Sequence, residues 1–261
     1  MNDTIPHDLV RQQIDDDIAI FTLNRPAKRN ALSLPVIGAL RAAFENLPAT
    51  VRVVILNGEG DHFSAGLDLS ELTATTPAES MMHSHQWYAA FRQIQFGRVP
   101  VISVLHGAVV GGGLELAAAT HVRVVEESGY FGLPEGQRGI FVGGGGSVRI
   151  SKLIGFSRVA EMMLTGRVYS AAEGVQLGLA HYLTPAGEGM RKARELARRI
   201  AGNAPLSNFA ILNALPLIAE QPMEHGLMTE SLMAAMTQGD DEAKQRVAAF
   251  LDKRAAKVVP T

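Results

Sequence analysis

A glycine-rich turn between two apolar segments constrains this chain more than any other feature. It lies within Gly107-Ala-Val-Val-Gly-Gly-Gly-Leu-Glu-Leu-Ala-Ala-Ala119. Glycines let the backbone bend tightly and let a ligand approach the main chain, whereas the Leu-Glu-Leu-Ala-Ala-Ala that follows favours helix. We therefore expect a strand, a glycine turn and a helix N-terminus whose unpaired N–H groups suit a developing negative charge. One carboxylate, Glu115, lies inside this apolar run.

A second carboxylate, Glu135, occurs in a similar setting, the apolar and turn-forming segment Phe131-Gly-Leu-Pro-Glu-Gly136. Two glutamates in apolar surroundings indicate acid/base chemistry. Burial raises the proton affinity of a carboxylate, and the pKa values of two close carboxylates are pushed apart, so that one can donate a proton while the other accepts one. For either residue alone a plainer interpretation is preferred. Glu115 would be a helix residue that reaches solvent, and Glu135 a turn or capping residue.

Composition limits the classes of partner. The 261 residues are 47% hydrophobic and 19% charged, enough for a sizeable core. A net charge of −2 without long charged runs predicts neither nucleic-acid nor membrane binding and favours small-molecule partners. The absence of cysteine excludes disulfides and thiol nucleophiles. With no signal-peptide pattern and no apolar stretch of membrane-spanning length, we expect a cytoplasmic protein.

Strand and helix patterns alternate along the first part of the chain. Strands are predicted at 17–24, 51–58, 99–107 and 122–126, with a helix at 34–47 and another after the glycine turn. This order implies an α/β fold with a parallel or mixed sheet that is buried on both faces. Later segments are helical only, at 190–202, 206–219, 223–237 and 240–254. We therefore predict an α/β core over 1–195 and a helical region over 196–261.

Four methionines in the helical region, Met223, Met228, Met233 and Met236, admit two interpretations. Base rates favour methionines that fill the core of the chain. The alternative is that these helices pack on a neighbouring subunit.

A further glycine element, His62-Phe-Ser-Ala-Gly-Leu-Asp-Leu-Ser-Glu71, follows the predicted strand at 51–58. If the N–H groups of Leu67 and Gly112 faced one point, they would form a two-donor oxyanion hole, in which one donor typically contributes about 2.7–4 kcal/mol. From spacing alone, a simple tight turn is the preferred interpretation.

Four motifs occur in a fixed order and are together far more specific than a single glycine pattern: Asn24-Arg-Pro-Ala-Lys-Arg-Asn-Ala-Leu32, Phe63-Ser-Ala-Gly-Leu-Asp68, His106-Gly-Ala-Val-Val-Gly-Gly-Gly-Leu-Glu-Leu116 and Phe131-Gly-Leu-Pro-Glu135. Together they resemble the crotonase (enoyl-CoA hydratase/isomerase) superfamily. The resemblance continues through Leu164-Thr-Gly-Arg167 and Ala171-Ala-Glu-Gly-Val-Gln-Leu-Gly-Leu-Ala180 and covers nearly the whole chain.

The resemblance implies a crotonase-like stack of ββα units with a C-terminal helical trimerisation region, present as a homotrimer or a dimer of trimers. It implies an enoyl-CoA hydratase of fatty acid metabolism, a lyase that adds water across the 2,3 double bond of an acyl-CoA thioester. By this likeness the N–H groups of Leu67 and Gly112 bind the thioester oxygen and stabilise an enolate. Glu115 activates water for attack on the β carbon, and Glu135 holds that water and protonates the α carbon.

The same resemblance places the acyl thioester between the loop at 24–32 and the segment at 65–69. Coenzyme A is then part of the substrate, and no separate cofactor is expected. The predicted substrate contacts are Ala27, Lys28, Ala31, Ala65, Asp68, Leu69, Gly111 and Pro134. Lys28 and Arg29 suit phosphate oxygens as charge-assisted donors and are equally consistent with solvated surface.

One segment departs from the family pattern. Val142 stands where hydratases of this family usually have a proline, within Gly136-Gln-Arg-Gly-Ile-Phe-Val-Gly-Gly-Gly-Gly-Ser147, so the pocket wall beside the acyl group should differ in shape. The segment is more similar to that of methylthioacryloyl-CoA hydratases than to that of straight-chain enzymes. Thioester hydrolysis and double-bond isomerisation remain alternative reactions. A non-catalytic RNA-binding or scaffold protein is an alternative of another class, against which the lack of a basic patch argues.

Metal binding is not predicted. His83 and His85 form a His-x-His pair without a third ligand at a sensible spacing, and a solvated helix face explains them better. The serines lack the Gly-x-Ser-x-Gly motif of a hydrolase nucleophile.

Overall fold

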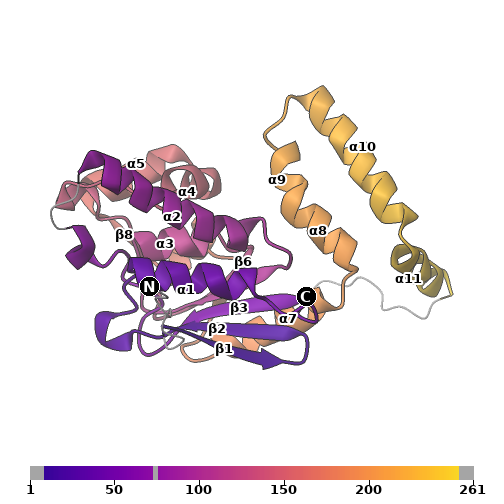
Figure 1. The fold of residues 1–261 in the computed structure, drawn as a ribbon, viewed down its shortest axis with the longest axis horizontal. Coiled ribbons are helices and arrows are strands. Elements are labelled where there is room, and N and C mark those ends of the chain that lie inside the picture. Colours follow the sequence, from indigo (N-terminus) through magenta and orange to yellow (C-terminus); the bar gives the residue numbers. More distant parts are fainter. Residues whose placement is uncertain (1–8, 73–75, 253–261) are drawn as a thin grey trace, which may run out of the picture. The chain divides into compact units, whose positions relative to one another are not determined.

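The computed structural model describes residues 9–72 and 76–252, and the chain divides into two units after Ala201 (Figure 1). The first unit contains a six-stranded sheet and a three-stranded sheet. In spatial order, the larger sheet consists of β1 (Val10–Asp15), β2 (Ile18–Leu23), β3 (Val53–Gly58), β4 (Val101–Leu105), β6 (Val122–Glu126) and β9 (Tyr182–Thr184). Only β1 and β2 pair antiparallel within it. The smaller sheet consists of β5 (Ala108–Val110), β7 (Tyr130–Gly132) and β8 (Val168–Ser170).

Successive side chains of a strand point to opposite faces of the sheet, and both faces are buried along the central strands β2, β3 and β4. Phe21 of β2 and Leu56 of β3 belong to one apolar core, whereas Ile20 and Ile55 belong to the other. The second core is completed by α7 (Gly189–Ala201). Burial on both faces explains why these strands are continuous apolar runs rather than alternating ones.

The remaining helices of the first unit are α1 (Leu34–Glu45), α2 (Pro77–Gln95), α3 (Gly112–Ala118), α4 (Gly146–Ile154), α5 (Phe156–Thr165) and α6 (Ala171–Leu177), with short 3-10 turns η1 (Pro26–Lys28), η2 (Leu69–Leu72) and η3 (Gly136–Arg138). Among them, α2, α3 and η2 contribute residues to the cavity described below. A capping box starts α2: Glu79 N donates to Thr76 Oγ1 at 3.2 Å and Thr76 N donates to Glu79 Oε2 at 2.7 Å. Trp87, Phe91 and Ile94 of this helix are buried in the first core.

The predicted α/β class and the buried mixed sheet are confirmed. The strands predicted at 17–24, 51–58 and 122–126 are β2, β3 and β6, and the range 99–107 contains β4. The predicted boundary at residue 195 falls inside α7, and the two units divide after Ala201. The division lies later because Ala193, Leu196 and Ala197 of this helix pack on the sheet.

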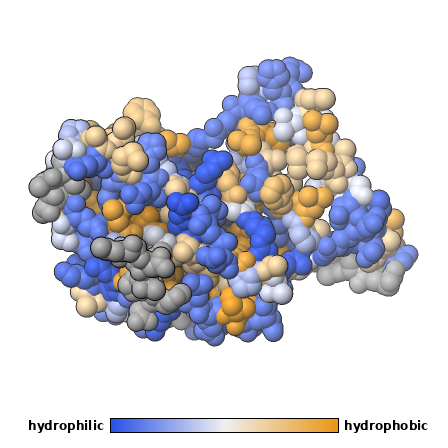
Figure 2. Space-filling model, viewed as in Figure 1, coloured by the Kyte–Doolittle hydropathy of each residue, from blue (hydrophilic) through white to orange (hydrophobic). Residues whose placement is uncertain are grey.

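The second unit contains α8 (Pro205–Asn213), α9 (Leu215–Ile218), α10 (Met223–Gly239) and α11 (Asp241–Leu251). The interpretation that the methionines of α10 fill the core of the chain is wrong, since Met223, Met228 and Met236 are 78%, 61% and 58% exposed. Figure 2 shows apolar side chains gathered over these helices. Within the described part of the chain, no helix has the length and apolar composition needed to cross a membrane.

Candidate active site

The turn between β5 and α3 has a backbone that requires glycine. Gly111 adopts φ 54° and ψ −125°, and a Cβ at this position would lie 2.7 Å from Oε1 of Glu135. Its N–H donates to the carbonyl of Gly132 at 2.9 Å, which ties the end of β5 to β7. The start of α3 and the segment that carries Glu135 are thereby held next to each other.

A second glycine segment packs directly on this turn. Gly66 has φ 91°, and a Cβ there would lie 2.6 Å from the carbonyl oxygen of Val110 and 3.0 Å from the nitrogen of Gly112. A Cβ on Gly112 would in turn lie 3.3 Å from the nitrogen of Leu67. Within the described residues, no acceptor pairs with the N–H of Leu67 or of Gly112. The segment around Ala65 is therefore more than an isolated turn, because it brings two unpaired main-chain donors close together.

The carboxylate of Glu115 is seated by the glycine run that precedes α4. Glu115 is 3% exposed, and its Oε1 accepts hydrogen bonds from Gly144 N at 2.8 Å and Gly146 N at 2.7 Å. Burial raises the pKa of this carboxyl, although the two N–H donors and the charge of Arg149 oppose the rise. A Cβ at Gly146 would lie 2.6 Å from Cγ of Glu115, so the glycines leave room for the carboxylate.

The second carboxylate, Glu135, is less firmly held. It is 7% exposed, and its Oε2 has no hydrogen-bond partner within the described residues. Burial, together with the smaller effect of the nearby charge of Glu115, raises the pKa of Glu135 to about 7, and the charge of Arg138 opposes the rise. Near neutral pH this carboxyl is therefore present in both its protonated and its ionised form.

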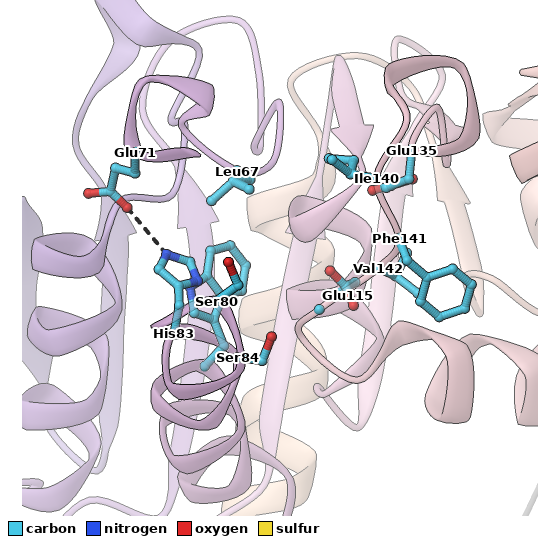
Figure 3. A pocket seen from close by; sticks show the side chains of 12 residues that line it. Leu67, Glu71, Ser80, His83, Ser84, Glu115, Glu135, Ile140, Phe141 and Val142 are labelled. Atoms are coloured by element: carbon cyan, nitrogen blue, oxygen red, sulfur yellow. Dashed lines mark ion pairs between the residues drawn. The ribbon is translucent and has the colours of Figure 1, made fainter. Parts of the chain in front are cut away.

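Both glutamates and Leu67 line one cavity of about 280 Å³. Its lining consists of Leu67, Glu71, Ser80, His83, Ser84, Trp87, Glu115, Glu135, Ile140, Phe141, Val142 and Gly143. Figure 3 shows two facing walls, with Leu67, Glu71, Ser80 and His83 on one side and the two glutamates and the segment from Ile140 to Val142 on the other. The glutamates predicted from the sequence therefore share one cavity.

None of the predicted substrate contacts is among the residues that line the cavity: Ala27, Lys28, Ala31, Ala65, Asp68, Leu69, Gly111 and Pro134. Their two segments do lie side by side, since Ala65 N donates to Arg29 O and Asp68 N donates to Leu32 O, both at 2.9 Å. Lys28 on η1 is exposed, as the alternative of a solvated surface requires.

The carboxylate of Asp68 already has protein partners. It accepts from Arg25 Nη2 at 3.0 Å and from Ser70 Oγ at 2.7 Å. The hydrogen bond from Ser70 lowers the pKa of Asp68, and the Arg25 guanidinium lowers it further. Its ion pair fastens the loop at 24–32 to the segment at 65–69.

Sequence reasoning missed the wall of the cavity that α2 provides. Ser80, His83, Ser84 and Trp87 follow the spacing of one helical face, and this pattern was the available signal. The expectation that His83 lies on a solvated face is wrong, because it is half-buried and its Nε2 lies 3.5 Å from Glu71 Oε2. The described residues contain no group of three or more histidine, aspartate or glutamate side chains that could hold a metal ion.

Comparisons with known proteins show the family and the fold to which this chain is similar. Residues 13–258 match the family described as Enoyl-CoA hydratase/isomerase. Enoyl-CoA hydratase EchA19 of Mycobacterium tuberculosis is 32% identical over 241 residues, which cover 90% of this chain and 91% of that protein. A crystal structure from Rhodopseudomonas palustris is 55% identical, has a TM-score of 0.92, and is matched over 96% of this chain and 97% of its own. That of an enoyl-CoA hydratase from Bacillus anthracis is 29% identical, with a TM-score of 0.88 and coverage of 95% and 98%.

Proposed function

The chain belongs to the enoyl-CoA hydratase/isomerase family, and on this premise we propose that it adds water across the 2,3 double bond of an enoyl-CoA thioester. The observation that carries the proposal is that two buried glutamates, Glu115 and Glu135, line one cavity. The unpaired N–H groups of Leu67 and Gly112 next to this cavity support it.

The two main-chain donors act as an oxyanion hole in this proposal. Leu67 N–H and Gly112 N–H bind the thioester oxygen, which makes the β carbon of the conjugated alkene electrophilic. When water adds, the negative charge that develops on this oxygen in the enolate meets donors that need no reorganisation. The glycine conformations at 66 and 111 are the backbone requirement for that arrangement.

The glutamates divide the proton transfers between them. Glu115, fixed by Gly144 and Gly146, takes a proton from the water whose oxygen bonds to the β carbon. Glu135, whose pKa is raised to about 7 by burial, holds the same water and delivers a proton to the α carbon. The product is a 3-hydroxyacyl-CoA, and transfer of the proton from Glu115 back to Glu135 through solvent restores the enzyme.

The wider proposal follows the family. Coenzyme A is bound as part of the substrate along the segments at 24–32 and 65–69, with no separate cofactor. The protein acts in the cytoplasm as a homotrimer or a dimer of trimers. The exposed apolar side chains of the second unit support subunit packing, including Phe209, Leu215, Leu227 and Leu232.

The test is the hydration of crotonyl-CoA by Glu115→Gln and Glu135→Gln variants. Each substitution keeps the size of the side chain and removes acid/base function, so we expect a loss of roughly 10²–10⁴ in kcat. The readouts are the absorbance of the conjugated thioester and the product mass. Glu127→Gln, on an exposed residue, is the matched control.

Four outcomes would contradict this proposal. Full activity in either site variant would remove the roles given to the glutamates. Release of free coenzyme A would indicate a hydrolase, and a shifted double bond without added water would indicate an isomerase. RNA binding without any acyl-CoA turnover would favour the non-catalytic alternative.

A further inference from the structure

The geometry of the proposed oxyanion hole depends on how two segments of the chain are joined. Leu67 follows the segment at 62–64, and Gly112 follows the strand β5 at 108–110. Neither donor N–H is paired within the described residues, so no hydrogen bond of its own fixes its direction. The separation of the two donors is therefore set by the contacts between the segments that precede them.

Main-chain hydrogen bonds join these segments as a short parallel pairing. Ser64 N donates to Ala108 O at 2.9 Å, and Val110 N donates to Ser64 O at 3.1 Å, around a bridge between Ser64 and Val109. The bonds of a parallel ladder are evenly spaced. If the pairing continued regularly, Ala108 N would therefore donate to the carbonyl of His62.

The carbonyl of His62 has a different partner. It accepts from the side-chain amide of Asn30 at 2.7 Å, and Asn30 is 1% exposed. The pairing is interrupted here, since Phe63 N rather than His62 N donates to His106 O, at 2.8 Å. Ala108 is 2% exposed, and its N–H needs an acceptor other than this carbonyl.

The imidazole of His62 takes the place of that carbonyl. Its Nδ1 accepts from Ala108 N at 3.1 Å. A main-chain N–H can only donate, so Nδ1 carries a lone pair and the proton of the neutral ring is on Nε2. The ring lies tightly against the neighbouring turn, because a Cβ on Gly107, whose φ is 52°, would lie 2.4 Å from His62 Nδ1. Unlike the main-chain bonds beside it, this link between the segments can be removed by substitution.

We propose that His62 is a positioning residue of the oxyanion hole, whose Nδ1 holds Ala108 N and thereby sets the separation of the N–H groups of Leu67 and Gly112. His62 is not among the residues that line the cavity, so it acts through the two segments rather than on the substrate. An oxyanion hole lowers the barrier only when its donors point at the oxygen on which charge develops. The inference rests on the proposed hydratase function and names what aligns its main-chain donors.

Substitutions of His62 separate the hydrogen bond from the presence of a side chain. His62→Asn places Oδ1 where Nδ1 lies, since both atoms are bonded to Cγ, whereas His62→Gln places its oxygen one bond further and His62→Leu has no acceptor. With crotonyl-CoA, we expect kcat to fall about 10-fold or more in the leucine and glutamine variants, with a smaller change in KM. The asparagine variant should stay within about 3-fold of the native rate.

A second measurement reports on the oxyanion hole itself. Butyryl-CoA has no double bond to which water could add, and hydrogen bonds to its thioester oxygen weaken the carbonyl bond and lower its infrared stretching frequency. In His62→Leu and His62→Gln, the frequency of bound butyryl-CoA should move toward that of the free compound, and in His62→Asn it should keep the native value. If His62→Leu does not fold, the comparison of the glutamine and asparagine variants decides.

His181 provides the matched control, because it makes the same kind of hydrogen bond elsewhere. Its Nδ1 accepts from Arg123 N at 3.0 Å, which joins β6 to the residue before β9, outside both glycine segments. His181→Leu should lower the free energy of unfolding and leave kcat and the carbonyl frequency unchanged. Equal losses of kcat in His62→Leu and His181→Leu, or equal kcat and carbonyl frequency in His62→Gln and His62→Asn, would overturn the inference.

The two proposals fail in different ways. If the native protein hydrates crotonyl-CoA and the His62 variants keep the native rate and carbonyl frequency, only the role of His62 is wrong. If the native protein hydrates no enoyl-CoA, the hydratase function is wrong, and the carbonyl frequency of bound butyryl-CoA still decides whether His62 aligns the two donors.

Discussion

At the scale of single residues, burial of Glu135 gives it the pKa that its proposed role requires and lowers the stability of the folded protein when the carboxyl is ionised. Its pKa in the folded protein is raised to about 7 by burial, compared with 4.5 for an ordinary glutamate. Between these values the folded state binds more protons than the unfolded state, so the stability contributed by the protonated form is lost as pH rises toward 7. A neutral side chain at this position avoids that loss.

Glu135→Gln should therefore be more stable than the native protein at pH 8, by about 3 kcal/mol. The difference should shrink as pH falls and vanish below about pH 4, where the carboxyl is protonated in both states. Urea unfolding at a series of pH values measures it. Parallel stability curves for the two proteins would show that burial of this carboxyl has no energetic cost.

The same titration should appear in catalysis. In the proposed mechanism Glu135 must carry a proton, so kcat/KM should decline on the alkaline side with an apparent pKa near 7. On the acid side, activity requires ionised Glu115, whose pKa is also raised by burial. The two values belong to the coupled pair rather than to either residue alone. A pH–rate profile with crotonyl-CoA that stays flat from pH 6 to 9 would contradict these roles.

Sequence reasoning identified the glutamates because a carboxylate is conspicuous among apolar residues. It could not find what holds Glu115, because Gly144 and Gly146 come from a distant segment and contribute only main-chain N–H groups. Trp87 was missed for a related reason. An aromatic residue on an amphipathic helix resembles an ordinary core residue until the cavity beside it is known.

At the scale of elements, the contact between the two glycine segments is the most sensitive part of the site. A Cβ on Gly66 would approach Val110 O to 2.6 Å and Gly112 N to 3.0 Å, in addition to the strain of its positive φ. We expect Gly66→Ala to lower the free energy of unfolding by more than 2 kcal/mol and to reduce hydration sharply, because it separates the two donors.

Gly187→Ala is the matched control for this substitution. Gly187 also has a positive φ, 80°, but no atom lies within 4 Å of a Cβ there, so only the backbone cost of about 1–2 kcal/mol applies. Denaturant unfolding and crotonyl-CoA hydration compare the two variants. Equal losses in both would show that the contact between the segments adds nothing to the strain of one residue.

Arg149 connects three elements around Glu115. Its Nε donates to Gln95 Oε1 of α2 at 2.6 Å, and its Nη1 donates to Gly144 O at 2.8 Å. Lysine keeps the charge, but it lacks the planar guanidinium group whose separate nitrogens make these two hydrogen bonds. Arg149→Lys should lower kcat about 10-fold with the fold intact, whereas Arg158→Lys on α5 should not. Circular dichroism and steady-state kinetics test this, and a native rate in Arg149→Lys would contradict it.

The elements also show where a sequence pattern stops being informative. Long apolar runs such as β2 and β3 were predicted because burial on both faces selects branched apolar residues. The strands β5, β7 and β8 have three residues each, too few to show a period. Their position depends on pairing between segments far apart in the chain.

At the scale of the whole molecule, exposed apolar side chains on the second unit require an explanation. On α10 only Gly226 is buried, while Leu227 and Leu232 are each 54% exposed. Such surface is uncommon on monomers. We expect light scattering to give a mass of three, or six, times the 27.9 kDa of one chain.

Leu232→Glu should reduce that mass to that of one chain, because the charge would be buried without a partner at a subunit interface. Gln245→Glu on an exposed position of α11 is the control and should leave the mass unchanged. A native protein that scatters as a single chain would make the predicted trimer wrong. The spacing of the four methionines in the sequence could not distinguish the core of one chain from an interface between subunits, since methionine suits both environments.

Gly144 and Gly146, which hold the carboxylate of Glu115, limit how this protein can be re-engineered. Any side chain at position 146 would meet Glu115 Cγ at 2.6 Å, and one at 144 would meet the Trp87 ring at 3.0 Å. Mutant libraries aimed at these positions should return almost entirely inactive members. Substitutions at Ser80, His83 and Ser84 on α2 leave these two glycines unchanged. Variants with a new preference for the acyl group should therefore come from substitutions in this helix rather than in the glycine loop.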